Sequence, residues 1–318
     1  MKAARLGSEE VTSPDSISHL PDDLLLRILS LLPVRTAMST SLLSKRWKPV
    51  WKMMPMLVYD ETCPYIGSLG FDLFCGVSLP LHEALKTLNL KLGKYSDSID
   101  TLLFPNIVPP LHRLSITSEP AYYGSDEPRL EISTPCLNYL KIFDRCGYYN
   151  FLEDMPKLVE ADVSVDMSKN ENLLRVLSSV EHLVICLYPS MVLDLTDSLI
   201  FNQLLHLELD VCNSFRSNLL LSFLKYFPNL QSLKLGRTYP EDTEDQLYCL
   251  GSEPSSVPKC LSFHLENIQW TGYGGTLDER EATATIRLQA TCMDDGQIIM
   301  KDVTSMSKAS ASCQLVIE

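Results

Sequence analysis

The side chains best suited to chemistry are ten cysteines and six histidines, scattered along a chain of 318 residues. No Cys-x-x-Cys pair occurs, and no histidine pair has the spacing of a zinc site. His182 and His206 occupy equivalent positions of a repeated pattern, with Glu208 nearby, but no third ligand or nucleophile accompanies them. Neither a nucleophile elbow nor a glycine-rich loop is present. The sequence therefore predicts no catalytic residue, no metal site and no cofactor.

Composition and charge narrow the classes of partner. The hydrophobic fraction is 45 %, which argues against a disordered chain. The formal net charge is -13, whereas nucleic acids and anionic membranes attract clustered positive charge. The first residues hold no apolar leader, and no run of eighteen apolar residues occurs. We expect a protein of the nucleus or cytoplasm, with reduced cysteines, that binds neither nucleic acid nor membrane.

Residues 15–55 predict a compact helical module. Pro21 lies near the start of a first helix, where its missing N–H costs nothing, and Pro33 ends that helix. Its apolar face consists of Leu24, Leu25, Ile28, Leu29 and Leu32. A second helical pattern runs from about residue 36 to residue 51. About forty residues are too few to bury so much apolar surface alone, so we expect a partner or a neighbouring domain to cover part of it.

The module resembles an F-box of the form common among plant F-box proteins. The resemblance is carried by Leu20-Pro21-Asp22-Asp23-Leu24, Ile28-Leu29, Leu32-Pro33 and Ser41-Leu42-Leu43-Ser44-Lys45-Arg46-Trp47. It implies a three-helix domain over residues 15–60 that docks onto the small adaptor subunit of SCF cullin-RING ubiquitin ligases. The adaptor contacts that it implies are Leu20, Pro21, Leu24, Ile28, Leu29, Leu32, Pro33, Leu43 and Trp47. The alternative is a plain helical hairpin whose apolar face is core.

A short phrase of the form apolar-x-x-apolar-x-apolar recurs through the middle of the chain. The instances are Leu85-Leu88-Leu90, Leu111-Leu114-Ile116, Leu137-Leu140-Ile142, Leu158-Ala161-Val163, Val180-Leu183-Ile185, Leu204-Leu207-Leu209, Leu230-Leu233-Leu235 and Leu265-Ile268-Trp270. Their spacing is close to the leucine-rich-repeat period, which predicts one strand per repeat and a continuous core between stacked repeats. Because the usual Asn or Cys after each strand is missing, we expect an irregular horseshoe over residues 61–250. The alternative is an ordinary α/β domain with leucine-rich strands.

Alternation along each expected strand assigns the polar residues to the opposite face of the sheet. Short helical stretches are expected between strands, over residues 172–178 and 218–226. The candidate contacts for a target protein are Lys91, Arg113, Tyr139, Lys141, His182, His206, Glu208 and Lys234. The alternative is that these side chains form an ordinary solvated face.

The last part of the chain, residues 251–318, resembles the FBD domain that closes many plant F-box/leucine-rich-repeat proteins. The resemblance is carried by Pro258-Lys259-Cys260-Leu261, Ile268-Gln269-Trp270, Gly272-Tyr273-Gly274-Gly275 and a closing strand, Ser312-Cys313-Gln314-Leu315-Val316-Ile317. Compared with the family, the stretch between residues 279 and 307 is short and weakly periodic, so the domain is expected to be shortened. The whole is predicted to be an α+β protein: a disordered tail over residues 1–14, an F-box, irregular repeats and an FBD cap.

These resemblances imply a non-catalytic substrate-recognition subunit of an SCF-type ubiquitin ligase, which binds the adaptor and, through it, cullin. The target protein is not identified by the sequence. Two other classes remain open: a leucine-rich-repeat interaction protein that does not act through a ligase, and a small-molecule-dependent receptor. The second would need a pocket with convergent basic residues, for which only Lys91, Arg113, Lys141 and Lys234 are available.

Overall fold

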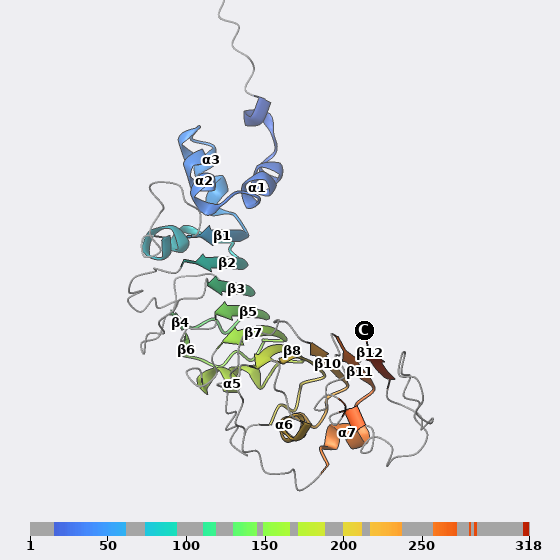
Figure 1. Ribbon diagram of the computed structural model, residues 1–318. Coiled ribbons are helices and arrows are strands. Elements are labelled where there is room, and N and C mark those ends of the chain that lie inside the picture. The colour runs from blue at the N-terminus through green and yellow to red at the C-terminus, as the bar shows by residue number, and fades with distance from the viewer. Residues whose placement is uncertain are drawn as a thin grey trace, which may run out of the picture.

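The chain forms a helical module joined to a long curved ladder of strands (Figure 1). The computed structural model describes residues 16–61, 74–93, 111–118, 130–144, 149–165, 171–187, 200–211, 217–236, 257–271, 280, 283–284 and 314–317. The predicted tail over residues 1–14 lies outside these ranges. The described part is a mixture of helix and parallel sheet.

The helical module consists of short helices. They are a 3₁₀ turn at Ser16–His19, α1 at Asp22–Ser30, α2 at Val34–Ser39, a 3₁₀ turn at Thr40–Leu42, and α3 at Trp47–Lys52. Their contact faces form one core, in which Leu25, Leu29, Val34, Ala37 and Trp47 are buried.

The second helical pattern, predicted from about residue 36 to residue 51, is not a single helix. The structure divides this segment, and α3 starts only at Trp47. Pro49 explains the division, because in the interior of a long helix it would remove a backbone hydrogen bond and press its ring against the carbonyl of Lys45. In the first turn of a new helix the missing N–H has no cost.

Ten strands of the described residues form a single sheet, in which neighbouring strands are parallel. They are β1 Met56–Asp60, β2 Thr87–Leu92, β3 Arg113–Ser118, β5 Tyr139–Asp144, β7 Glu160–Val165, β8 His182–Leu187, β9 His206–Val211, β10 Ser232–Gly236, β11 Asn267–Trp270 and β12 Gln314–Ile317. Apart from β4 and β6, which pair separately, strands that follow one another in the chain are neighbours in the sheet. Each repeat phrase ends on one of the strands β2, β3, β5 and β7 to β11.

The register aligns the apolar positions of all these phrases. Leu88, Leu114, Leu140 and Ala161 are successive partners, and Leu183, Leu207, Leu233 and Ile268 continue the row. All are almost completely buried. One row of apolar side chains therefore runs the length of the sheet, which explains why the burial alternates along each strand.

A repeated backbone contact fixes this register at the point where each strand begins. The carbonyl oxygen of the residue before one strand accepts hydrogen bonds from two consecutive N–H groups at the start of the next. The acceptors are Pro55, Lys86, His112, Asn138, Val159, Glu181, Leu205 and Gln231. Because the same contact recurs at each step from β1 to β11, this entry edge of the sheet is a row of closely spaced turns.

Shorter elements cover the outer side of the ladder. They are a π-helical turn at Phe74–Ser78, a 3₁₀ turn at Leu79–Leu81, the pair β4 Leu130–Ile132 and β6 Tyr149–Phe151, and the helices α5 Glu171–Leu177, α6 Ser217–Leu224 and α7 Lys259–Phe263. Helices α5 and α6 occupy the two stretches predicted to be helical, and Figure 1 shows α5, α6 and α7 along the outside of the bend. The buried Cys260 thiol of α7 donates to the carbonyl oxygen of Leu224 in α6, at 3.6 Å.

The strands at the two ends of the sheet, β1 and β12, can be compared with the predicted domain limits. Strand β1 lies within the predicted F-box range of 15–60, yet it pairs with β2 and belongs to the sheet. At the other end β12 pairs with β11, in agreement with the predicted closing strand. Most of the weakly periodic stretch between residues 279 and 307 lies outside the described residues. Within the described ranges, no helix is long and apolar enough to span a bilayer.

Candidate functional site

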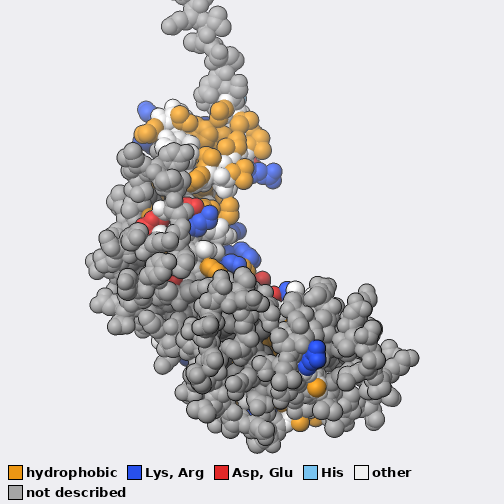
Figure 2. All heavy atoms as spheres, viewed as in Figure 1, with side chains coloured by type: hydrophobic (Ala, Val, Ile, Leu, Met, Phe, Trp, Pro, Cys, Tyr) orange, Lys and Arg blue, Asp and Glu red, His pale blue; other side chains and the backbone are white. Residues whose placement is uncertain are grey.

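The helical module presents a cluster of apolar side chains to solvent. Five leucine and isoleucine residues of α1, its end and the turn after α2 are exposed: Leu24 by 42 %, Ile28 by 42 %, Leu31 by 84 %, Leu42 by 85 % and Leu43 by 69 %. We call these five residues the apolar patch. In Figure 2 hydrophobic side chains gather over this end of the molecule. Large contiguous apolar surfaces are rare on soluble proteins and usually mark an interface.

The structure divides the nine predicted adaptor contacts into surface and core. Pro21, Leu24, Ile28, Pro33 and Leu43 are exposed, and Leu20 and Leu32 are partly buried against the core. Leu29 and Trp47 are buried, at 0 % and 5 % exposure. Leu29 and Trp47 therefore pack the core of the helical module. They support its surface but contribute almost no exposed area to a contact.

Two members of the apolar patch, Leu31 and Leu42, were not predicted as contacts. Helical spacing contains a signal for Leu31, because Leu24, Ile28 and Leu31 follow one another at i, i+4 and i+7 on one side of the helix. Leu25 and Leu29 form a second stripe that faces the core. Leu42 carries no such signal, because it lies in a 3₁₀ turn that the sequence did not predict.

An ion pair holds the first helix against the turn that precedes the third. The Arg46 guanidinium contacts the Asp22 carboxylate, with Nε donating to Oδ1 at 3.1 Å, and its Nη2 donates to the carbonyl oxygen of Leu20. Asp22 is in the first turn of α1, where a carboxylate also meets the positive end of the helix dipole. Arg46 therefore positions the segment on which several of the predicted adaptor contacts lie.

The eight predicted target contacts lie on one face of the ladder, which we call the polar face. Its first row runs through Thr87, Arg113, Tyr139, Glu160, His182, His206, Ser232 and Asn267. Its second row runs through Asn89, Ser115, Lys141, Asp162, Val184, Glu208, Lys234 and Gln269. Lys91 is one step further along β2 and faces Asp60 of β1.

Neighbouring strands pair these side chains with one another. The Arg113 guanidinium carbon lies 3.9 Å from the centre of the Tyr139 ring. Three ammonium groups have carboxylate partners: Lys91 with Asp60 at 3.1 Å, Lys141 with Asp162, and Lys234 with Glu208 at 2.8 Å. The hydrogen bond to Asp162 raises the pKa of Lys141, so this ammonium stays protonated.

The contacts of these cations count against the alternative of a small-molecule-dependent receptor. Such a receptor would need basic groups that converge on one ligand. Lys91, Lys141 and Lys234 each contact a carboxylate on an adjacent strand, and Arg113 stacks on an aromatic ring. The four predicted cations are thus spread along the face and already engaged, which gives that alternative no support.

His182 and His206 are direct neighbours in β8 and β9. Their rings are stacked, with centroids 4.4 Å apart and planes inclined by 7°. Partial burial and the neighbouring His182 both lower the pKa of His206, while Glu181 opposes this shift. Within the described residues no group of three or more histidine, cysteine, aspartate or glutamate side chains could hold a metal ion.

The chain thus belongs to a class of proteins with a helical module at one end of a ladder of parallel strands. The F-box domain model matches residues 17–59, and the FBD model matches residues 253–293. An F-box/FBD/LRR-repeat protein of Arabidopsis thaliana is 44 % identical over the full length of both chains. An FBD-associated F-box protein from the same plant is 37 % identical over all of this chain and 98 % of the relative.

This chain therefore belongs to the plant F-box/FBD/leucine-rich-repeat proteins. A further Arabidopsis thaliana member, also an F-box/FBD/LRR-repeat protein, is 30 % identical over 96 % of this chain and all of the relative. No solved structure gives a significant match. F-box domains generally bind the adaptor of SCF complexes, and F-box proteins generally act as substrate adaptors of these ligases.

Proposed function

We propose that this chain is a non-catalytic substrate-recognition subunit of an SCF-type ubiquitin ligase. Its F-box docks onto the adaptor and so joins cullin, while an irregular leucine-rich-repeat solenoid closed by the FBD region binds a target protein. The observation that carries the proposal is the apolar patch, which lies within the residues that the F-box family model matches. Buried Leu29 and Trp47 support that surface from below.

Charge distribution supports docking to an acidic partner. The chain as a whole carries -13, but residues 16–54 hold only two carboxylates, Asp22 and Asp23, beside six Lys and Arg residues. Arg27, Arg35, Lys45 and Lys48 of this set are exposed. Opposite charge around an apolar contact raises the association rate more than the affinity, and salt weakens that gain.

The proposed chemistry is supplied by proximity. The ubiquitin thioester belongs to other subunits of the ligase, and this chain holds a target lysine near it. Tethering turns a bimolecular encounter into an effectively intramolecular reaction, which raises its rate without any catalytic group on the tether. Cys136 and Cys260 are free thiols, which supports a reducing compartment, so we place the protein in the nucleus or cytoplasm.

The test is co-expression with an SCF adaptor subunit and affinity purification. Ile28→Asp puts a carboxylate into the apolar patch, and we expect adaptor binding to weaken roughly a hundredfold or more, as for other central anchors of interfaces. Leu152→Asp is the matched control, because Leu152 has the same 42 % exposure and lies after β6, outside the module. It should bind like the wild type.

The outcomes separate the candidate functions. A soluble Ile28→Asp variant that still binds the adaptor would contradict the docking assignment. Wild-type protein that binds the adaptor but never recovers cullin would instead favour an interaction protein that does not assemble a ligase. Soluble wild type that fails to bind any adaptor would remove the ubiquitin argument altogether.

A further inference from the structure

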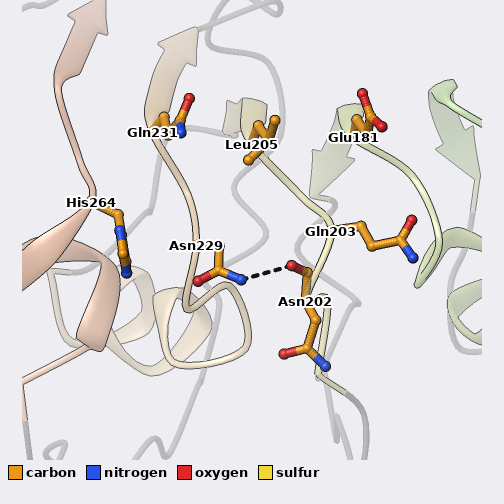
Figure 3. Close-up of a pocket in the computed structure, with 7 residues that line it drawn as sticks. All are labelled: Glu181, Asn202, Gln203, Leu205, Asn229, Gln231 and His264. Carbon is orange, nitrogen blue, oxygen red and sulfur yellow. Dashed lines mark hydrogen bonds between the residues drawn. The ribbon is translucent and has the colours of Figure 1, made fainter.

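A shallow groove of about 420 Å³ lies at the entry edge of the ladder, among the turns that lead into β8, β9, β10 and β11 (Figure 3). It is lined by Glu181, Asn202, Gln203, Leu205, Asn229, Gln231 and His264. We call it the rim groove. None of its lining residues belongs to the predicted target contacts on the polar face.

Backbone contacts fix the floor of the rim groove. The carbonyl oxygens of Glu181, Leu205 and Gln231 each accept two N–H groups from the next turn, at 2.8–3.1 Å. In addition, Asn229 Nδ2 donates to the carbonyl oxygen of Asn202 at 2.8 Å, which ties the turns before β9 and β10 together. These hydrogen bonds hold the backbone of the rim groove in place. The polar ends of the other lining side chains can therefore form hydrogen bonds with a ligand.

The lining chemistry is unusual in its concentration of primary amides. Four of the seven lining residues are Asn or Gln, and none is Lys or Arg. Each primary amide offers a carbonyl acceptor beside NH₂ donors, which is the complement of a peptide group with its own N–H and C=O. Without a cation the groove has no group to neutralise a phosphate or an acidic segment. It therefore suits the neutral main chain of a peptide.

The dimensions of the rim groove also suit an extended chain. All lining residues are exposed or half-buried, so a ligand would lie across the edge rather than be enclosed. The turns before β8 and β11 are three strand spacings apart, about 14 Å at roughly 4.8 Å per step, which an extended peptide covers in about four residues.

We infer that the rim groove binds an extended peptide segment of a target protein through its main-chain amide groups. The inference rests on the target-binding part of the proposed function. The two ends of the groove differ: the Glu181 carboxylate lies at one, and at the other the 66 % exposed Phe263 ring lies 6.3 Å from the His264 ring. The segment therefore carries a basic side chain at one end and an apolar one about four residues away.

A neutral oligosaccharide is the competing ligand class, since it also uses many hydrogen bonds. A chain of sugar rings needs flat apolar surface along its length, whereas the aromatic rings of Phe263 and His264 lie together at one end of the rim groove. The alternating donors and acceptors of a peptide account for the amides without that requirement. A peptide is thus the better match to this lining.

The test is selection from a random decapeptide phage-display library on the full chain, purified with the adaptor. Enriched sequences are synthesised, and their dissociation constants are measured by fluorescence polarisation. We expect a basic and an apolar residue about four positions apart, and about tenfold or greater weakening by the double variant Gln203→Ala, Gln231→Ala. Asn89→Ala removes an amide from the polar face of β2 and should change the affinity less than twofold.

Each result either supports or overturns peptide binding in the rim groove. Peptides that bind the double variant as tightly as the wild type would overturn it, as would no enrichment at all, or binding of cellotetraose that the double variant loses. Retained adaptor binding and melting temperature show that the variants are folded. If the chain does not bind the adaptor, the same selection is made on the full chain purified alone; peptides that behave as expected there mean that the ligase proposal fails and the rim groove stands.

Discussion

Side chains on the polar face contact partners on the adjacent strands. Lys141 with Asp162 and Lys234 with Glu208 are ion pairs between groups that are about one-third exposed, or slightly more. Ion pairs this exposed contribute only about 0.2–1 kcal/mol each. The prediction that this face binds a target therefore implies recognition by shape and hydrogen bonding more than by net charge.

The stacked histidines make stability depend on pH. Because the pKa of His206 is lowered in the folded state, by burial and by His182, the folded chain binds this proton less readily than the unfolded chain. Above about pH 6.5, the ordinary histidine pKa, His206 is neutral in both states and its lowered pKa costs the folded state no stability. The loss of stability grows as the pH falls from that value to the lowered pKa, and it is complete below both.

We therefore expect the wild type to lose more stability between pH 7.5 and pH 5 than His206→Asn, which has no proton to gain. Urea unfolding at both pH values measures this difference. In His182→Asn the pKa of His206 should move back up, because one of the two groups that lower it is gone, and NMR titration of the ring protons records it. An unchanged His206 titration would contradict the role of the stack.

At the scale of the element, α1 carries two apolar stripes with different tasks. Leu25 and Leu29 face the core of the module, whereas Leu24 and Ile28 face solvent. A nine-residue helix is marginal on its own, so the buried stripe and its contact with α3 must hold it. Substitutions in the buried stripe should accordingly lower stability, whereas substitutions in the exposed stripe should weaken adaptor binding.

Trp47→Ala tests this division at the start of α3. The side chain is 5 % exposed, so its removal should lower the free energy of unfolding by about 3–5 kcal/mol. Leu43→Ala, at a 69 % exposed position, should change it by less than about 0.5 kcal/mol while weakening adaptor binding. Chemical denaturation followed by tryptophan fluorescence and circular dichroism gives both values. Equal losses would mean that both positions are core.

At the scale of the whole molecule, the helical module and the ladder share β1. This strand follows α3 after three residues, contacts α2, and pairs with β2 along Met56–Asp60. Leu57 and Tyr59 of β1 are buried, and the Tyr59 ring stacks on the ring of Phe74 at 4.8 Å. A shared strand limits how far the helical module can move relative to the ladder, which the proposed proximity mechanism requires.

Two truncated chains test the shared strand. A chain that begins at residue 56 keeps β1, and a chain that begins at residue 62 loses it and leaves the edge of β2 unpaired. We expect the shorter chain to melt at least about 5 °C lower and to aggregate more readily, because unpaired edges associate. Differential scanning calorimetry and light scattering compare the two. Identical melting temperatures would show that β1 belongs to the module alone.

Local patterns determined much of this protein from the sequence. The apolar phrases predicted the strands because alternate side chains of a strand must face opposite sides. The same alternation placed all eight predicted target contacts on one face. The F-box and FBD motifs could also be recognised from the sequence, since each depends on a short run of residues.

The tertiary structure alone decided which residues meet. Register between strands brought His182 against His206 and Lys141 against Asp162, and no pattern within one repeat contains that information. Packing of α1 against α3 buried Leu29 and Trp47 while it left Leu31 exposed, because the same leucine can serve a core or a surface. The rim groove likewise exists only where four turns from distant parts of the chain are brought side by side.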